Sequence, residues 1–483
     1  MASLRNSALV AGIAQYAMFV LVFLKIAVVS RFLTPAELGA FTLASSVVFL
    51  AQFLRVFGTW DYIVAQEKLT EDQLRQCFTL IAVTGMVVFC AYMLAAEPLA
   101  AFFRAPEISG ILWIMAPSFL ILPIGTVTLA VMTRNMEFAL LSRIRIGATL
   151  ADTVVTIALI LLNVGVLSLA IGYTAGNVVS VLMVVALRRG GLVYRPLLRG
   201  IGNVVRFGSI SALGTFLNAV GFSGPAILLG YGMTPAIVGV FGRGQALITF
   251  FRQGIEVASR PVTMAWFAKR ARDGHVDTGA AYLRVTTLLA GFTWPGYIGL
   301  YFGAPTLVPL LLGNQWQDSV VITQILALGG MMSFYAVTGI SIFEGHGHVS
   351  KRLTINLIIQ GQRFLLLALA LPHGLIMFTV ALSLSHFVSF VLMSLFLRAE
   401  TGLRFVDVLR SLVRSILVAF LMVALNLVLF SSVFASEQLT LAELGAYVLM
   451  MLAAWVGSIA IVRHPLWFEL LHVSRRVFSR IRS

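Results

Sequence analysis

Residues 34–41 read TPAELGAF, and residues 234–241 read TPAIVGVF. Thr, Pro, Ala, Gly and Phe recur in register, and each copy lies between two long apolar runs. Proline lacks a backbone donor and its ring presets φ, so a Thr-Pro pair ends one helix and opens the next. A helical hairpin that recurs 200 residues later predicts a duplicated membrane protein with two matched halves.

Composition supports a membrane protein, because the 483 residues are 59% hydrophobic and only 11% charged. Spanning a hydrocarbon core takes about 20 apolar residues, and such runs follow one another along the chain. We therefore predict an all-α polytopic membrane protein with about 14 transmembrane helices: two pseudo-symmetric six-helix bundles plus two C-terminal helices. The expected spans are 8–32, 37–60, 74–96, 110–133, 143–163, 165–187, 204–230, 236–260, 282–303, 318–343, 353–371, 375–397, 411–431 and 441–462.

Basic residues indicate the orientation. Under this topology, 27 of the 34 Lys and Arg residues lie on the side that carries both termini, and only Arg31 and Arg104 lie on the other side. The remaining five lie within helices. Because short cytoplasmic loops are enriched in Lys and Arg, both termini are expected to be cytoplasmic. The net charge of +15 then reflects orientation and contact with anionic lipid, and no nucleic-acid partner is expected.

A second pair of tight turns extends the repeat. Gly165 and Gly374 lie at matching places between two apolar runs, with an offset of 209 residues. Helices one to six therefore match helices seven to twelve, as a parallel repeat with substrate expected between the halves near the midplane. The predicted domains are an N-terminal bundle at 1–187, a basic cytoplasmic linker at 188–203, a C-terminal bundle at 204–397, and two extra helices with a basic tail at 398–483.

Five cations lie inside the expected spans: Lys25, Arg55, Arg243, Arg252 and Arg363. A charge at the bilayer centre costs about 2.5–3.5 kcal/mol, so these side chains should face a hydrated cavity or a partner. The alternative is that long side chains reach the nearer interface. At 1.5 Å per residue, Lys25 lies roughly 15 Å from the outer end of its helix. At this depth, its side chain reaches the interface only with difficulty.

All five cations are candidates for substrate binding. We call the Thr-Pro stretches at 34–41 and 234–241 the two hinges. Arg55 and Arg252 occupy nearly equivalent positions relative to these hinges, on the same face of matched helices. Arg243 is close enough to the outer end to reach that interface. Arginine forks bind phosphate oxygens in pairs, and lysine acts as a point charge, so the group would recognise an anion.

Some polar and aromatic residues leave two interpretations open. Asn356, Gln360 and Arg363 follow one helical stripe, which indicates either a cavity wall or hydrogen bonding between helices. His386 is isolated in the sequence and is expected to be structural. Trp316 would anchor the chain at the interface or contact sugar.

Two deep acids are candidates for ion coupling. Asp152 lies in the middle of its helix, and Glu256 lies four residues after Arg252. An acid in a low-dielectric environment can carry a proton or bind a cation. The alternatives are an ion pair between Glu256 and Arg252, and, for Asp152, a structural hydrogen bond or a pair with Arg145.

No catalytic arrangement is present in the sequence. There are no paired carboxylates in a loop, no nucleophile elbow, no Walker loop and no metal-ligand cluster. We therefore expect no catalytic residue, no enzymatic activity, no metal and no cofactor other than a coupling ion, H⁺ or Na⁺.

Four stretches carry a family resemblance: SRFLTPAELG at 30–39, RNMEF at 134–138, LLGNQW at 311–316 and EGHG at 344–347. In their order and spacing the chain resembles the polysaccharide transporters of the multidrug/oligosaccharidyl-lipid/polysaccharide flippase superfamily, in the colanic acid and succinoglycan exporter branch. The resemblance covers most of residues 1–400.

The resemblance implies two six-helix bundles around a central cavity, in the bacterial inner membrane. By alternating access they would flip polyprenyl-pyrophosphate-linked oligosaccharides for exopolysaccharide, capsule or O-antigen export. Related lipid II flippases place cavity cations on helices 1, 2 and 8, where Lys25, Arg55 and Arg252 fall. Expected partners are the lipid-linked substrate, membrane lipids, and the polymerase and chain-length machinery.

Two other functions are alternatives. A cation-coupled multidrug antiporter of the same superfamily would favour deep acids, whereas deep cations predominate here. A membrane glycosyltransferase or polymerase would be expected to carry a sizeable acidic catalytic loop, and no loop of that kind is present.

Overall fold

A computed structural model describes residues 2–187, 195–272, 278–345, 349–433 and 439–472. Within these ranges, side chains are described except at 2–14, 210, 255–272, 341, 344–345, 349–350, 432–433 and 441.

The described residues form helices and no strand. The α-helices are α1 (Ala2–Phe32), α2 (Pro35–Val56), α3 (Thr59–Ala65), α4 (Glu71–Phe102), α5 (Glu107–Met115), α6 (Ser118–Arg134), α7 (Phe138–Leu161), α8 (Leu167–Leu187), α9 (Gly202–Gly232), α10 (Pro235–Arg272), α11 (Thr278–Leu312), α12 (Ser319–Gly345), α13 (Val349–Ala370), α14 (Gly374–Thr401), α15 (Phe405–Val428) and α16 (Leu441–Ile461). Short helical turns occur at Asn314–Trp316, Leu371–His373 and Leu429–Val433.

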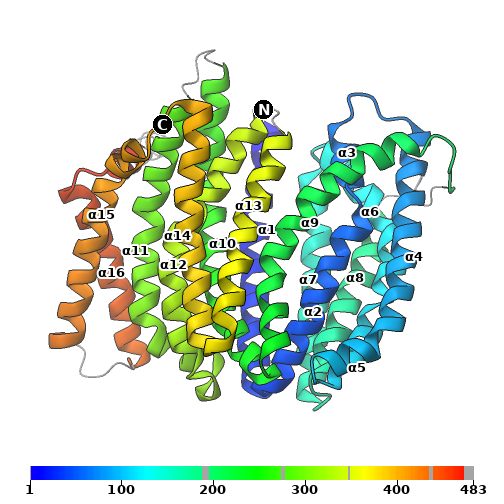
Figure 1. Ribbon diagram of the computed structural model, residues 1–483, viewed down its shortest axis with the longest axis horizontal. Coiled ribbons are helices and arrows are strands. Elements are labelled where there is room, and N and C mark those ends of the chain that lie inside the picture. Colours follow the sequence, from blue (N-terminus) through cyan, green and yellow to red (C-terminus); the bar gives the residue numbers. More distant parts are fainter. Residues whose placement is uncertain (1, 188–194, 273–277, 346–348, 434–438, 473–483) are drawn as a thin grey trace. The chain divides into compact units, whose positions relative to one another are not determined.

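The chain divides into two compact units, Met1–Gly242 and Arg243–Ser483. In the first unit, α7 packs against α1 and α8, and α2 packs against α9. In the second unit, α12 packs against α11 and α14, and α15 packs against α11 and α16. Within each unit the long helices run side by side (Figure 1). The predicted boundaries of the duplicated bundles stay a prediction.

The first hinge is a capped helix start. Thr34 is the N-cap of α2, and its hydroxyl accepts a hydrogen bond from the Glu37 backbone N–H at 3.3 Å. Glu37 returns the contact, because its Oε2 accepts the Thr34 backbone N–H at 2.8 Å. Pro35 occupies the first turn, where a missing N–H costs no hydrogen bond. The TPAELG stretch therefore begins a helix for local reasons.

The two hinge copies face each other within the first unit. A Cβ added to Gly39 would collide with the Pro235 carbonyl oxygen, and a Cβ added to Gly239 would collide with that of Pro35. The glycine of each copy thus lies against the proline of the other. Helix backbones approach this closely only over residues without side chains. The sequence repeat is therefore also a contact in space.

A second close contact joins the far end of α2 to the start of α9. Phe57 and Gly58 have left-handed backbones, with φ of 46° and 66°, and end the helix. A Cβ on Gly58 would meet the Gly208 carbonyl oxygen, and one on Gly208 would meet that of Phe57. The Ser211 hydroxyl also donates to the Asp61 carboxylate. Glycine contacts therefore fasten α2 at both of its ends.

The predicted fold class is confirmed, but the count of 14 spans is not. Among the described residues, 12 helical segments are long and apolar enough to cross a membrane. Lys351–Thr401 counts as one such segment, although it contains both α13 and α14. Helix α10, which covers the expected span 236–260, is not among the 12. The other expected spans each coincide with one of these segments.

Two predicted spans are interrupted in the structure. The expected span 37–60 ends at the left-handed residues Phe57 and Gly58, and the chain then forms the separate helix α3. The expected span 110–133 breaks between α5 and α6 at Pro117. Proline cannot donate the helical hydrogen bond, which explains the second break.

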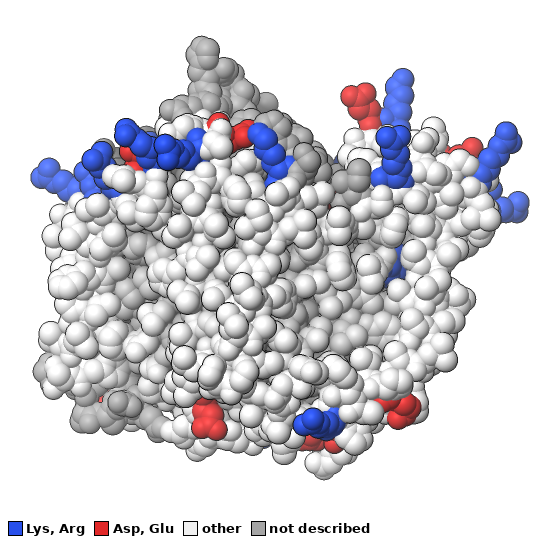
Figure 2. All heavy atoms as spheres, viewed as in Figure 1, with Lys and Arg blue, Asp and Glu red and all other residues white. Residues whose placement is uncertain are grey.

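The surface between the helix ends is apolar. On the face drawn in Figure 2, charged side chains gather near the ends of the helices of each unit, and the area between them is nearly uncharged. Large apolar side chains are exposed on the helices of both units, among them Leu94 of α4, Phe420 of α15 and Leu449 of α16. A multi-pass membrane protein explains this exposure, because lipid covers such faces.

A buried histidine holds the last two helices against α11. His464 is fully buried, and its Nε2 lies 3.0 Å from the Ser415 hydroxyl of α15. Its Nδ1 accepts the Leu466 backbone N–H at 3.1 Å, so the neutral ring carries its proton on Nε2. Gly291 of α11 provides the space, because a Cβ there would collide with the imidazole.

The glycine contact at the hinges predicts a loss of stability for Gly39→Ala. The added methyl group has no space beside Pro235, and overpacking of this kind costs about 1–3 kcal/mol. We expect a lower midpoint of thermal unfolding in detergent, and the same for Gly239→Ala. Gly361→Ala is the matched control, because a Cβ at Gly361 meets no atom within 4 Å. A wild-type midpoint for Gly39→Ala would contradict the contact.

Burial and the charge of Arg414 lower the pKa of His464 to about 4. An unfolded histidine has a pKa of about 6.5. The neutral ring therefore contributes its full stability above pH 6.5, and this contribution is lost as the pH falls toward 4. We expect a destabilisation of about 2 kcal/mol at pH 5 relative to pH 7.5. His464→Gln should reduce this pH dependence of the unfolding midpoint, and an unchanged dependence would refute the assignment.

Candidate functional site

Lys25 and Asp152, two of the residues singled out in the sequence, form an ion pair in the first unit. Lys25 on α1 places its Nζ 2.5 Å from Asp152 Oδ2 on α7. Both side chains are partly exposed, at 19% and 21%. The structure thus joins a candidate for substrate binding to a candidate for ion coupling. Asp152 has Lys25 as its partner, where Arg145 was one expectation.

Asp152 is held tightly against α8. The Thr156 hydroxyl, one turn further along α7, donates to Asp152 Oδ1 at 3.3 Å. On α8, Gly172 and Gly176 lie opposite, and a Cβ on either would crowd Asp152. The G-x-x-x-G spacing thus lets α7 and α8 approach closely around the carboxylate.

Arg55 belongs to a neighbouring hydrogen-bonded chain. Its side chain is only 4% exposed. The guanidinium donates to Gln52 Oε1 at 3.1 Å and to the Thr126 hydroxyl of α6 at 3.2 Å. Gln52 in turn donates to the Tyr173 hydroxyl at 2.8 Å. Tyr173 lies on α8 and interacts electrostatically with both Arg55 and Asp152.

In the second unit, Arg363 on α13 lies against α14. Its Nε donates to the Ser385 hydroxyl at 3.3 Å, and its NH1 donates to Gln360 Oε1 at 3.1 Å. Of the predicted polar stripe, Gln360 and Arg363 therefore act together. Asn356 does not join them: it is 1% exposed, and its Nδ2 has no hydrogen-bond partner among the described residues.

His386 is a residue whose surroundings the sequence reasoning missed. It follows Ser385 on α14 and interacts electrostatically with Arg363 and with Arg252 of α10. The expected isolated histidine therefore belongs to a group of basic side chains from three helices. No local motif could have revealed this, because it depends on the register in which α13 and α14 pack.

Two further predictions meet different surroundings. The Arg243 guanidinium lies 5.8 Å from the ring centre of Trp316, a cation–π contact. Trp316 is fully buried, so it presents no ring to a sugar in this structure. The side chain of Glu256, and with it the suggested pair with Arg252, lies outside the described residues.

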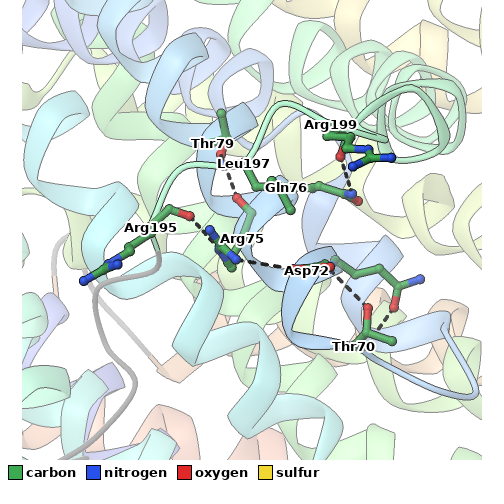
Figure 3. A network of polar contacts seen from close by, with 9 residues as sticks. Thr70, Asp72, Arg75, Gln76, Thr79, Arg195, Leu197 and Arg199 are labelled. Atoms are coloured by element: carbon green, nitrogen blue, oxygen red, sulfur yellow. Dashed lines mark hydrogen bonds and ion pairs between the residues drawn. The ribbon is translucent and has the colours of Figure 1, made fainter.

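Part of the predicted linker 188–203 is fastened to the start of α4 (Figure 3). Arg75 Nε and Gln76 Nε2 donate to backbone carbonyls of residues 195–199 at 3.0 and 2.8 Å. Thr79 Oγ1 accepts a backbone N–H of the same segment at 2.8 Å. Three side chains on one face of α4 thus position the segment that leads into α9.

Across the described ranges, no group of three or more His, Cys, Asp or Glu residues could hold a metal ion. The polar groups within the spans are instead suited to hydrogen bonding and to anions.

Residues 28–321, more than half of the chain, match the family model described as "Polysaccharide biosynthesis protein". The chain belongs to this family. The Bacillus subtilis teichuronic acid biosynthesis protein TuaB is 23% identical over 295 residues, which cover 58% of this chain and 59% of that protein. The succinoglycan biosynthesis transport protein ExoT of Rhizobium meliloti is 24% identical over 335 residues, covering 68% and 66%. The alignments thus span three fifths to two thirds of these relatives.

The fold matches a solved structure titled lipid II flippase MurJ, in an inward closed conformation. The TM-score is 0.76, the identity is 10%, and the match covers 96% of this chain and 100% of that one. At this identity the likeness concerns the fold. The family resemblance and the multi-pass membrane fold are confirmed, and family membership agrees with a transporter rather than an enzyme.

The Arg55 network predicts an order of stabilities. Gln52→Leu removes one partner of the buried Arg55 guanidinium, which keeps Thr126, and one partner of the Tyr173 hydroxyl, whereas Arg55→Met removes the charge together with its need for partners. An unsatisfied buried group costs about 1–3 kcal/mol, and more when it is charged. We therefore expect the unfolding midpoint of Gln52→Leu to lie below that of Arg55→Met. The reverse order would show that the Gln52 contact does not satisfy Arg55.

Proposed function

We propose that this protein flips polyprenyl-pyrophosphate-linked oligosaccharide repeat units across the bacterial cytoplasmic membrane by alternating access. The observation that carries the proposal is membership of the polysaccharide biosynthesis family, in a chain whose fold matches a flippase over 96% of its length. The exported polymer would be an exopolysaccharide, a capsule or an O-antigen.

The chemistry of the spans supports this proposal. A lipid pyrophosphate must cross a hydrocarbon layer, where an unpaired anion is very costly. Lys25 in the first unit, and Arg252 and Arg363 in the second, offer cations within the helices. Guanidinium forks fit phosphate oxygens, and an ammonium group attracts them as a point charge.

In the proposal, Arg55 and Arg243 contact the substrate only during part of the conformational cycle. Arg55 is buried between Gln52 and Thr126, and Arg243 lies against Trp316. Either guanidinium would reach a phosphate only after these neighbours rearrange. We include both as residues that contact substrate during the conformational cycle.

We further propose an ion gradient, of H⁺ or Na⁺, as the source of energy, with Asp152 and Glu256 as candidate carriers. The termini are proposed to be cytoplasmic, in accordance with the distribution of Lys and Arg. Polysaccharide polymerase and chain-length machinery are the proposed protein partners.

The direct test is transport in proteoliposomes that contain a polyprenyl-pyrophosphate-linked oligosaccharide. Replacing Lys25, Arg252 or Arg363 by Ala should each lower the flipping rate about tenfold to a hundredfold, the scale of one hydrogen bond to a charged group. The matched control is Lys351→Ala, which removes an exposed cation paired with Glu400 at 2.8 Å. We expect this control to keep the wild-type rate.

Three outcomes would count against the proposal. Wild-type rates in all three variants would show that these three cations do not bind the substrate. Transport of cationic drugs without transport of the lipid-linked sugar would favour the multidrug antiporter. Sugar transfer by the purified protein would favour a glycosyltransferase or polymerase.

A further inference from the structure

We propose that the Asp152 carboxylate is a resident anion that holds Lys25 in the empty transporter and that the substrate's phosphate must displace. Asp152 is then a positioning residue, and Lys25 is its exchangeable counter-ion. The inference rests on the proposed function and adds to it a step of ion-pair exchange.

Asp152 is the fixed member of the pair. Thr156 binds one of its oxygens, and Gly172 and Gly176 bring α8 so close that a Cβ at either position would crowd it. An aspartate side chain has only two rotatable bonds, and its packing against α8 leaves it little room. The carboxylate therefore stays in place when its partner moves.

Lys25 is the member that can move. Its ammonium lies at the end of a flexible four-carbon stem and has three donors. The side chain is 19% exposed, on a helix whose neighbours in sequence, Val22 and Leu24, are exposed. A phosphate that approaches this side of α1 can thus draw the ammonium away while Asp152 keeps its contact with Thr156.

The neighbouring charges make the exchange reversible. Lys25 on α1 pairs with Asp152, and the Tyr173 hydroxyl of α8 interacts electrostatically with both Asp152 and Arg55 of α2. When a phosphate takes Lys25, two anions lie close together in a medium of low dielectric constant, and they repel each other. This repulsion favours return of Lys25 to Asp152 and release of the substrate. A transporter needs such release, because very tight binding would stop its cycle.

The inference predicts that Asp152→Asn binds the head group more tightly and transports more slowly. Removal of the competing carboxylate should raise the affinity of the purified protein for undecaprenyl pyrophosphate about tenfold, the scale of one charge-assisted hydrogen bond. Release then becomes slower, so the maximal flipping rate falls while the half-saturating concentration also falls. Glu400→Gln is the matched control, because it neutralises the carboxylate of an ion pair at Lys351; its affinity and rate should remain those of the wild type.

A double-mutant cycle separates exchange from a structural role. In Lys25→Met protein, the further change Asp152→Asn should no longer raise the affinity, because the cation in dispute is absent. If Asp152→Asn weakens binding, or changes it equally with and without Lys25, then Asp152 does not compete with the substrate for Lys25, and the inference is wrong.

Labelling of the Lys25 amine provides a readout that does not depend on transport. With an amine-acylating reagent and mass spectrometry, Asp152→Asn should raise the labelling of Lys25, because a free amine reacts faster than one held in an ion pair. Saturating undecaprenyl pyrophosphate should protect Lys25 in the wild type. If neither the wild type nor any variant binds this lipid, the proposed function fails. If the lipid binds but does not protect Lys25, only the proposed exchange fails.

Discussion

A charged or polar side chain inside a hydrocarbon layer must find its partner within the protein, and the described helices are packed around this constraint. Lys25 meets Asp152, Arg55 meets Gln52 and Thr126, and Arg363 meets Ser385 and Gln360. Each of these contacts joins residues of different helices or successive turns of one helix. The polar residues therefore determine which faces of otherwise apolar helices turn toward one another.

Glycine makes these contacts geometrically possible. Gly172 and Gly176 admit Asp152 between α7 and α8, just as Gly39 and Gly239 admit the carbonyl oxygens of the opposite hinge. Without side chains, two helix backbones can approach until van der Waals contact is continuous. Dispersion then replaces the hydrophobic effect, which does not favour association between helices already in lipid. The same glycines make these interfaces intolerant of even one added methyl group.

In the proposed exchange, the pairing of Lys25 with Asp152 also relates substrate binding to substrate release. When no substrate is bound, the carboxylate of Asp152 balances the charge of Lys25, so the protein contains no isolated buried charge at this position. A phosphate that replaces the carboxylate gains only the difference between two similar interactions. In the proposed transport cycle, moderate affinity follows from this difference, and it suits both the capture and the release of the substrate.

The sequence by itself determined the membrane class, the repeated hinge and the deep cations, because apolar length, Thr-Pro helix starts and isolated charges are local properties. It also identified Lys25 as a candidate for substrate binding and Asp152 as a candidate for ion coupling, but with no relation between them. Only the tertiary structure decided that they pair, that Arg55 is buried by Gln52 and Thr126, and that His386 joins Arg363 and Arg252. These pairings depend on the rotation and register of helices far apart in the chain. Hydropathy barely constrains rotation and register, because lipid accepts any apolar face and only interhelical contacts distinguish one face from another.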